Sequence, residues 1–501
     1  MAQLNFALPP GIYSKGTERQ ATGRWHSGNL IRWLSGILRP VYGWVQHSTS
    51  TLTGAARAIQ VWKDNTALSW IGIGTHSKLY IMNRAGTLYD VTPAALTVGR
   101  ADATYGTGYG GGLFGGGTFG TPRPDTTAIL DATVWTLDTF GQNLIGCNSD
   151  DTYIYTWVAP TTGTIAAKIT NAPTANALVT TAERFIFALG ANADPRSVAW
   201  CDQQNSTVWT PAATNQAGSF PLQTAGRIMC GRRLTGSTGL WTDADMWIAT
   251  YIGGTLVYSF AKAGSGCGII SRQAVAVADS RCAWMGVNGF FVYDGYVQPI
   301  PCDVQDYVFG DLNRVQASKI HAFLNSQYGE VWWFYCSASS TEIDRAVAWS
   351  YRDNIWMTHN LARTAAADVN GAFTFPLMID PTTATVYEHE TGFSYGSAVP
   401  YAETGPVEFA ANAFTNDGDG AKVWQASAFV PDEYLEGDVT VIFKARIFPN
   451  GPESTFGPYV LTPKTDVRFS GRQVKMRITA ARTDDWRFGN ARLDVDGEGD
   501  R

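Results

Sequence analysis

Short apolar runs separated by hairpin turns recur along this chain, and this repetition restricts its fold more than any other feature. In "AWMGVNGFFVYDGYVQPIP" (283–301), the runs are interrupted by Asn288-Gly289 and Asp294-Gly295. Both central residues of a type I′ turn need positive φ, which Asn, Asp and Gly tolerate best. The runs between these turns are β-branched or aromatic and too short for helices. The stretch therefore predicts a three-stranded meander.

The same plan recurs, so that seven units can be counted. They begin near residues 69, 143, 184, 240, 283, 330 and 372. All but the first spacing are close to the roughly 40–50 residues of a propeller blade. An isolated meander cannot bury both faces, whereas blades packed radially can, and they leave only short protected edges. The sequence predicts an all-β fold with a β-propeller of about seven blades over residues 51–400.

A glycine-rich segment, "YGTGYGGGLFGGGTFGTPRPD" (105–125), fills the long first spacing. Glycine maximises backbone freedom, and the spaced aromatic residues are too few to offset the ordering entropy. The segment is predicted to be a long insertion that leaves the first blade. It is either a flexible surface loop or a segment that docks on a neighbouring chain or lines a channel. In the second case the candidate inter-subunit or adaptor contacts are Tyr105, Tyr109, Phe114, Phe119 and Arg123.

The two ends of the chain differ from the repeats. Within 401–501, "DVTVIFKARIF" and "GRQVKMRITA" alternate apolar and polar residues, as half-buried strands do. About six such strands in about a hundred residues predict a C-terminal β-sandwich. Residues 1–50 are predicted to be an extended N-terminal arm, with a strand that closes the ring as the alternative.

Charge and targeting signals narrow the function classes. The formal net charge is −6, 16% of residues are charged, and there is no Lys/Arg-rich run. This excludes a basic nucleic-acid footprint, although DNA could still pass without being bound. No secretory signal and no apolar run of about twenty residues occurs. The seven cysteines never form a CxxC motif and are predicted to be reduced and mostly buried, with a disulfide or metal role as the alternative.

Catalytic motifs are absent from the sequence. There is no P-loop, GxSxG or HExxH, and no two of the six histidines are four residues apart. "NDGDG" (416–420) and "GSGCG" (264–268) lack the further residues of a calcium or phosphate loop and are predicted to be turns. No catalytic, cofactor-binding or metal residue is assigned, and the chain is expected not to be an enzyme.

Two residue types leave an alternative open. Aspartates at turns or loops suit turn formation, although a catalytic carboxylate pair is the alternative. The abundant Trp and Tyr are expected to fill the wedges between blades, with stacking on sugars as the alternative. The aspartates are Asp243, Asp245, Asp294, Asp303 and Asp306.

Several longer motifs carry a family resemblance. In order, they are "GRWHSGNLIRWLSGILRPVYGW", "YGTGYGG", "SVAWCDQQNSTVWTP", "GCGIISRQA", "WMGVNGFFVYDGYVQPIPCDV", "EVWWFY" and "SGRQVKMRITAARTDDWRFGNARLDVDGEGDR". Together they resemble the tail nozzle (tail hub) proteins of short-tailed bacteriophages, a group similar to the P22-type packaged-DNA stabilisation protein. The resemblance spans most of the chain.

The resemblance implies a virion protein that is assembled in the host cytoplasm as a homohexameric ring. Its implied partners are other copies of itself, the adaptor or head–tail connector, tail fibres or spikes, and DNA that passes through the lumen without sequence specificity. It implies no enzymatic activity and no cofactor. The family motifs fall on Gly289, Phe290, Tyr293, Asp294, Gly295, Arg472, Trp486, Gly489 and Arg492, which are taken as structural.

The expected function is therefore a nozzle that extends the portal–adaptor channel, retains packaged DNA and conducts it during ejection. Weak net charge suits a conduit, because each neutralised phosphate adds affinity and friction. Many aromatic residues and few charges suit large subunit interfaces. A host-receptor-binding or glycan-degrading phage tail protein and a cellular propeller interaction module are the alternatives.

Overall fold

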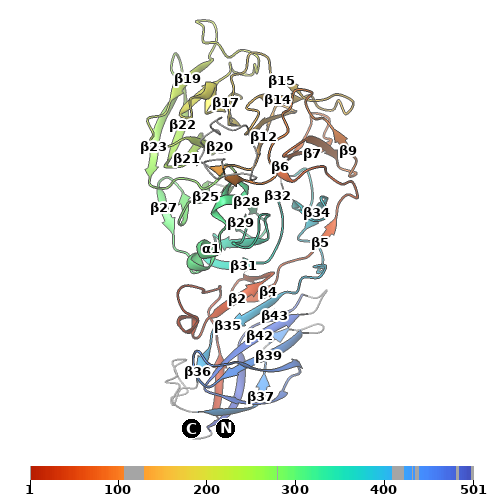
Figure 1. Cartoon of the computed structure of the whole chain (residues 1–501), viewed down its shortest axis with the longest axis vertical. Coiled ribbons are helices and arrows are strands. Elements are labelled where there is room, and N and C mark those ends of the chain that lie inside the picture. The colour runs from red at the N-terminus through yellow and green to blue at the C-terminus, as the bar shows by residue number, and fades with distance from the viewer. Residues whose placement is uncertain are drawn as a thin grey trace, which may run out of the picture.

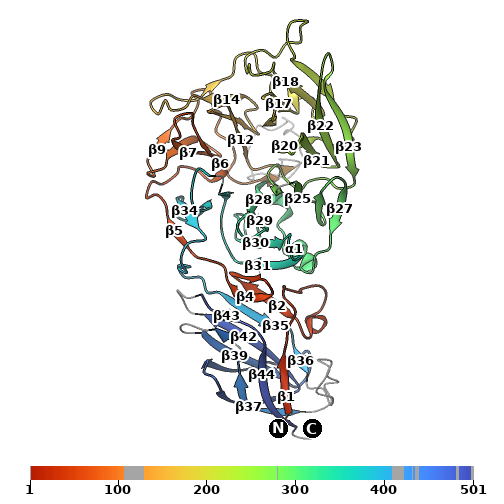
Figure 2. The same cartoon turned by 180° about the vertical axis from the view of Figure 1, so that it is seen from behind.

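A computed structural model describes residues 2–105, 129–278, 280–369, 371–408, 423–431, 433–434, 439–480 and 485–497. The chain forms a β-propeller and a β-sandwich that is attached to the propeller rim (Figure 1). Both termini lie at the far end of the sandwich (Figures 1 and 2). The predicted all-β propeller fold is confirmed.

Seven four-stranded antiparallel sheets within the described residues are the blades, numbered here in chain order. Blade 1 consists of β6 (Ala56–Lys63), β7 (Ser69–Thr75), β8 (Leu79–Asn83) and β9 (Leu88–Asp90). Blade 2 consists of β12 (Trp135–Phe140), β13 (Asn143–Asn148), β14 (Ile154–Trp157) and β15 (Ala167–Lys168). Blade 3 consists of β16 (Ala177–Thr180), β17 (Ile186–Leu189), β18 (Ser197–Trp200) and β19 (Gly218–Pro221).

The remaining blades follow the same plan. Blade 4 consists of β20 (Ile228–Leu234), β21 (Ser237–Thr242), β22 (Asp245–Gly253) and β23 (Val257–Ser265). Blade 5 consists of β24 (Val275–Ala278), β25 (Arg281–Met285), β26 (Phe290–Tyr293) and β27 (Val297–Ile300). Blade 6 consists of β28 (His321–Asn325), β29 (Glu330–Tyr335), β30 (Arg345–Ser350) and β31 (Ile355–His359). Blade 7 consists of β32 (Ala365–Ala367), β33 (Leu377–Ile379), β34 (Val386–His389) and β5 (Trp44–Gln46).

The first strand of each blade lies innermost, and these strands follow one another around the axis until β32 returns to β6. The ring is closed by β5, which comes from the N-terminal segment and pairs with β34 in the register Glu388↔Val45. Short linking elements are β10 (Thr104–Tyr105), β11 (Ile129–Leu130), α1 (Gln305–Gly310) and the 3₁₀ helices Glu18–Ala21, Ala191–Ala193 and Arg314–Lys319.

The sandwich is built from both ends of the chain. One sheet has the order β1 (Ala2–Phe6), β44 (Ala491–Gly497), β37 (Trp424–Val430), β41 (Thr465–Gly471). The facing sheet has the order β2 (Trp25–Asn29), β35 (Tyr401–Thr404), β42 (Gln473–Ala480), β39 (Val439–Arg446), β40 (Ser454–Val460), and β36 (Val407–Glu408) also pairs with β42. A small sheet has the order β3 (Ile31–Leu34), β4 (Ile37–Pro40), β43 (Arg487–Phe488), β38 (Glu433–Tyr434).

Residues 1–50 are not an extended arm, because their strands belong to three sandwich sheets and to blade 7. The alternative, that this segment supplies a strand that closes the ring, agrees with the pairing of β5 with β34. Phe429 and Phe443 contact each other between the two large sheets, with ring centroids 5.3 Å apart. Because strands from both ends of the chain form the sandwich, the propeller is inserted into it between β4 and β35, and the sandwich is discontinuous in sequence.

A buried ion cluster joins the two domains. The Arg32 guanidinium of β3 pairs with Glu330 at 3.0 Å and with Glu390 at 2.6 Å, and all three side chains are less than 5% exposed. It also lies 3.7 Å from the centre of the Tyr328 ring. Burial raises the pKa of Glu330 although Arg32 opposes the shift. Because an ion pair in low dielectric is costly to separate, this cluster holds the sandwich against blades 6 and 7.

Candidate functional site

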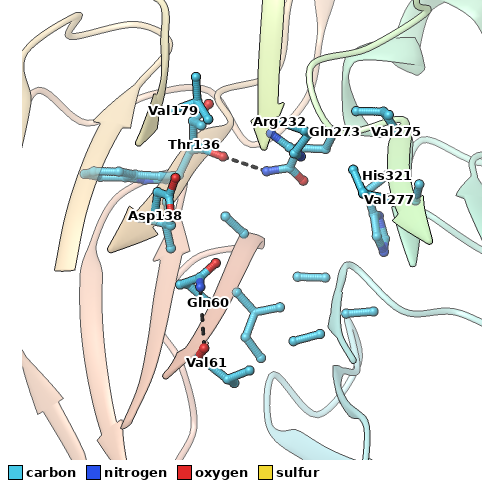
Figure 3. Close-up of a pocket in the computed structure, with 18 of the residues that line it drawn as sticks. Gln60, Val61, Thr136, Asp138, Val179, Arg232, Gln273, Val275, Val277 and His321 are labelled. Carbon is cyan, nitrogen blue, oxygen red and sulfur yellow. Dashed lines mark hydrogen bonds between the residues drawn. The ribbon is translucent and has the colours of Figure 1, made fainter. Parts of the chain in front are cut away.

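The innermost strands surround a central cavity of about 410 Å³ (Figure 3). Side chains of a strand alternate between its two faces, so each innermost strand presents only a few residues to this cavity. The polar residues of its lining include Gln60, Thr136, Asp138, Arg232 and His321, and the apolar ones include Val179, Val275 and Val277. Close approach of blade 2 to blade 1 requires Gly74, where an added Cβ would lie 2.4 Å from the Trp135 ring.

A hydrogen bond crosses the axis at one end of this cavity. The Gln273 side-chain amide, just before β24, donates from Nε2 to the Trp135 carbonyl oxygen at 2.6 Å. Beside it, Arg272 donates from Nη1 to the Met229 carbonyl oxygen at 3.1 Å. A single side-chain hydrogen bond is enough to span this end of the cavity. A DNA duplex cannot pass there, because its major groove alone is about 12 Å wide. The axis of a single propeller is thus not a DNA path.

The ionisable groups of the cavity are held in structural contacts. Asp138 pairs with Arg233 at 2.9 Å and accepts a hydrogen bond from the Thr180 backbone at 2.8 Å. His321 is 3% exposed, and its ring stacks on Phe334 at a centroid distance of 4.9 Å. Burial lowers the pKa of His321 to about 3, so this imidazole is neutral at physiological pH.

The turn aspartates do not converge on one site. Asp243 pairs with Arg227 at 3.4 Å, and Asp245 pairs with Lys262 at 2.7 Å. Burial alone would raise the pKa of Asp245, but hydrogen bonds from Lys262 and from Thr242 outweigh it and lower the pKa. These two residues therefore stabilise the β21–β22 turn.

The other three candidate aspartates lie on blade 5 and on the segment after it. Asp294 is exposed in the β26–β27 turn. The Asp306 carboxylate accepts a hydrogen bond from the Gly16 backbone at 3.2 Å, and the Asp303 carbonyl oxygen accepts one from the Ser14 backbone at 2.9 Å. Asp303 and Asp306 thus tie the N-terminal segment to the propeller.

The aromatic residues fill the wedges between blades, as predicted. Trp157 of blade 2 contacts Trp62 and Trp70 of blade 1, with centroids 6.3 and 5.4 Å apart. Phe290 of blade 5 is 1% exposed and contacts Trp333 of blade 6 at 4.8 Å.

The meander motif combines this buried aromatic residue with turn positions. Tyr293 ends β26, and Gly295 of the following turn has φ of 114°. Gly289 lies in the turn that precedes β26.

The C-terminal motif residues lie in the sandwich. Trp486 is 1% exposed, and the Arg472 guanidinium lies 5.9 Å from the centre of the Phe448 ring. Arg492 stands in β44 opposite Asn5 of β1, and Gly489 is exposed between β43 and β44.

The predicted adaptor-contact residues are almost all outside the described part of the chain. Tyr105 alone is placed, through its backbone, which pairs with Ile129 of β11. Tyr109, Phe114, Phe119 and Arg123 lie outside the described residues, as does "NDGDG" (416–420).

The stem of the glycine-rich segment lies beside the axis of the propeller. Ile129 and Leu130 line a second cavity of about 530 Å³, together with Met229 and Arg272. Met229 and Arg272 lie at the end of the central cavity where Gln273 is bonded to Trp135. The flanking strands β10 and β11 therefore lie at this face of the propeller, close to the hydrogen bond that crosses its axis.

Within the described residues, no group of three or more His, Cys, Asp or Glu side chains is placed to hold a metal ion. All seven cysteines are free and buried, as predicted. Burial raises the pKa of Cys147 to about 12, which disfavours its thiolate. No helix in the described part of the chain is long and apolar enough to span a membrane.

Comparison with known proteins finds similarity at the level of fold. No family model and no curated sequence matches the chain. Virginiamycin B lyase from Staphylococcus aureus is 8% identical with a TM-score of 0.39, and the match covers 68% of this chain and 97% of the lyase. The Pan2 WD40 domain of Neurospora crassa is 11% identical with a TM-score of 0.38, covering 70% of this chain and 96% of that domain. YCF48 bound to a D1 peptide is 8% identical with a TM-score of 0.39, covering 72% and 100%.

Proposed function

We propose that this chain is a structural component of a bacteriophage tail, a nozzle or hub ring that extends the portal–adaptor channel. In this role it retains packaged DNA and conducts it during ejection. The ordered motifs from the N-terminal segment to the C-terminal strands favour this role. The protein would belong to the virion, assemble in the host cytoplasm as a homohexamer, and bind the adaptor and the tail fibres or spikes without acting as an enzyme.

The observation that carries the proposal is the continuity of the two domains. One hydrophobic cluster includes Trp284 and Trp356 of the propeller together with Trp25 and Trp424 of the sandwich. The buried Arg32 cluster adds ion pairs at the same junction. A part that withstands the pressure of packaged DNA must not hinge between its domains, and this junction resists hinging because bending would expose apolar surface and charge.

The hydrogen bond across the propeller axis restricts where DNA could run. Because Gln273 and Trp135 are bonded across the axis, DNA would run in a lumen that several copies enclose. A heterologous contact with a closing rotation generates such a ring.

One sheet of the sandwich carries two lysines that are matched by carboxylates. Lys444 and Lys475 stand opposite each other on β39 and β42. Lys444 pairs with Glu403 at 2.8 Å, and Lys475 pairs with Glu18 and Glu453. Each Lys or Arg that neutralises a phosphate adds affinity. Because Lys475 is buried and Lys444 already pairs with a carboxylate, neither lysine would hold DNA in place as it slides.

Removal of the gene tests this function. Phage particles assembled without this chain are expected to package DNA and then lose it, and supplying the protein in trans should restore retention. Particles that keep their DNA and infect normally without the chain would contradict the proposal.

A further inference from the structure

One arginine in the second cavity, which Ile129 and Leu130 line, has no carboxylate partner among the described residues. Arg272 lines this cavity and donates from Nη1 to the Met229 carbonyl oxygen at 3.1 Å. A guanidinium has several N–H donors, and this is the only hydrogen bond that the Arg272 side chain makes within the described part of the chain. Burial, and then the charge of Arg227, lower the pKa of Arg272, so its surroundings disfavour the charge that it carries.

The two carboxylates of the cavity lining are already bound to other arginines. Asp150 pairs with Arg100 at 2.5 Å, and Asp131 pairs with Arg227 at 3.5 Å. Asp243, which also pairs with Arg227, does not line the cavity. Because three arginines and two aspartates line the cavity, its lining carries one positive charge in excess.

Two hydroxyl groups of the same lining have a hydrogen left to donate. Ser149 Oγ accepts a hydrogen bond from the Val134 backbone N–H at 3.1 Å, and Ser318 Oγ accepts one from the Ala132 backbone N–H at 3.1 Å. Neither hydroxyl donates to an acceptor among the described residues. Spare N–H and O–H donors beside a spare positive charge suit an anion, and a carboxylate can accept two parallel N–H bonds from one guanidinium.

Much of the remaining lining is apolar. Ile129 is 40% exposed and Leu130 is 39% exposed, and both line the cavity together with Ile270. The volume of about 530 Å³ lies within the range of small-molecule sites and exceeds what a bare inorganic ion would fill. Apolar side chains at a cavity wall gain free energy when an apolar group covers them. A ligand that fits this cavity therefore combines an anionic group with an apolar body.

We propose that this cavity binds a small carboxylic acid with an apolar body, in its carboxylate form. The carboxylate pairs with Arg272 and accepts hydrogen bonds from the Ser149 and Ser318 hydroxyls, and the apolar body covers Ile129 and Leu130. One negative charge matches the excess charge of the lining. A phosphate ester, with a charge of about −1.5 to −2, would leave excess negative charge beside the two aspartates. The site is independent of the proposed role in a tail.

Isothermal titration calorimetry of the full-length protein with matched probes tests the ligand class. Benzoate carries both features, benzamide replaces the carboxylate with a neutral amide of similar shape, and acetate lacks the ring. Benzoate should bind at least about tenfold more tightly than benzamide, because hydrogen bonds to an ionised group are the stronger ones. It should also bind at least about tenfold more tightly than acetate, because the ring covers the apolar wall. Phenyl phosphate should bind more weakly than benzoate.

Two variants locate the site. Arg272→Gln should weaken benzoate binding at least about tenfold and leave the weaker binding of benzamide nearly unchanged. Leu130→Ser, at a partly exposed position, should weaken benzoate binding about threefold and leave acetate binding unchanged. Arg84→Gln is the matched control, because Arg84 is exposed and does not line the cavity, and it should leave the affinities for all probes unchanged.

The ligand class and its placement fail on different results. Equal affinities for benzoate and benzamide, tighter binding of phenyl phosphate than of benzoate, or no saturable benzoate binding up to about 10 mM would each overturn the ligand class. Full benzoate affinity in Arg272→Gln would overturn the placement in this cavity. If Arg272→Gln does not fold, Leu130→Ser decides the placement, and an unchanged affinity for benzoate in that variant would overturn it.

Discussion

Replacement of Arg32 by methionine tests the junction between the two domains. In Arg32→Met, the carboxylates of Glu330 and Glu390 remain buried and lose the cation that both of them contact. Breaking a buried ion pair by removing one partner costs about 3–5 kcal/mol, and two stranded carboxylates place the expected loss at the upper end of that range. The urea m-value grows with the surface exposed on unfolding and exceeds about 3 kcal/mol per molar for a chain of this size, so the unfolding midpoint should fall by less than about 1.7 M.

The control is Arg39→Met in the same part of the chain. Arg39 pairs with Asp485 at 2.6 Å, but these side chains are 13% and 29% exposed. A partly exposed pair contributes about 1 kcal/mol or less, so this variant should shift the midpoint only slightly. Both variants are followed by tryptophan fluorescence in urea.

Acidification separates the charge effect from a packing defect. In Arg32→Met, burial raises the pKa of Glu330 above the unfolded value with no cation to oppose the shift, so the folded state takes up a proton first as the pH falls. The deficit relative to wild type should therefore shrink between pH 7 and pH 5. Equal losses for Arg32→Met and Arg39→Met, or a deficit that does not change with pH, would refute this account of the junction.

Three further predictions concern other parts of the chain. Burial lowers the pKa of both His321 and His359 from 6.5 to about 3, so their stabilising contribution is complete above pH 6.5 and is lost as the pH falls toward 3. By pH 4.5 each should cost about 3 kcal/mol, and His321→Phe should remove its share of the acid-induced loss in urea unfolding. Gly74→Ala forces a Cβ against Trp135 and should destabilise the propeller by about 1–3 kcal/mol in thermal unfolding, whereas Gly163→Ala, with open space around it, should be neutral. None of the seven cysteines should react with a thiol reagent in the native protein, and all seven should react in denaturant. A fast-reacting thiol in the native protein would contradict their burial.

Local patterning revealed most of each blade. The predicted units near 69, 143 and 330 coincide with the starts of β7, β13 and β29, because turn dipeptides and aromatic runs mark the three outer strands. The innermost strands were not recognised. β32 is Ala-Ala-Ala and β24 is Val-Ala-Val-Ala, and the small side chains of these two innermost strands give a weak strand signal.

The sequence allowed residues 1–50 to supply a strand that closes the ring, as β5 does, but the partner of each strand in this segment could not be read from local sequence. β1 pairs with β44, and β5 pairs with β34, so their partners lie hundreds of residues away in the chain. No local pattern reports such pairing, because strand propensity describes a fit to a pleated surface and not to a particular neighbour.

The candidate site was predictable only in part. The aromatic wedge residues follow from composition, since large rings are the usual filling between packed sheets. The bond from Gln273 to Trp135 and the pairing of Arg32 with Glu330 join residues that are 138 and 298 positions apart, and nothing in the sequence marks them as partners.

A density map of the purified tail tests the central proposal most directly. The account predicts six copies of this chain in a ring on the tail axis, adjacent to the adaptor. The DNA path should lie in the lumen that these copies enclose, and the bond from Gln273 to Trp135 should cross the axis of each propeller. A tail whose ring contains a different protein, or DNA density along the axis of a single propeller, would contradict it.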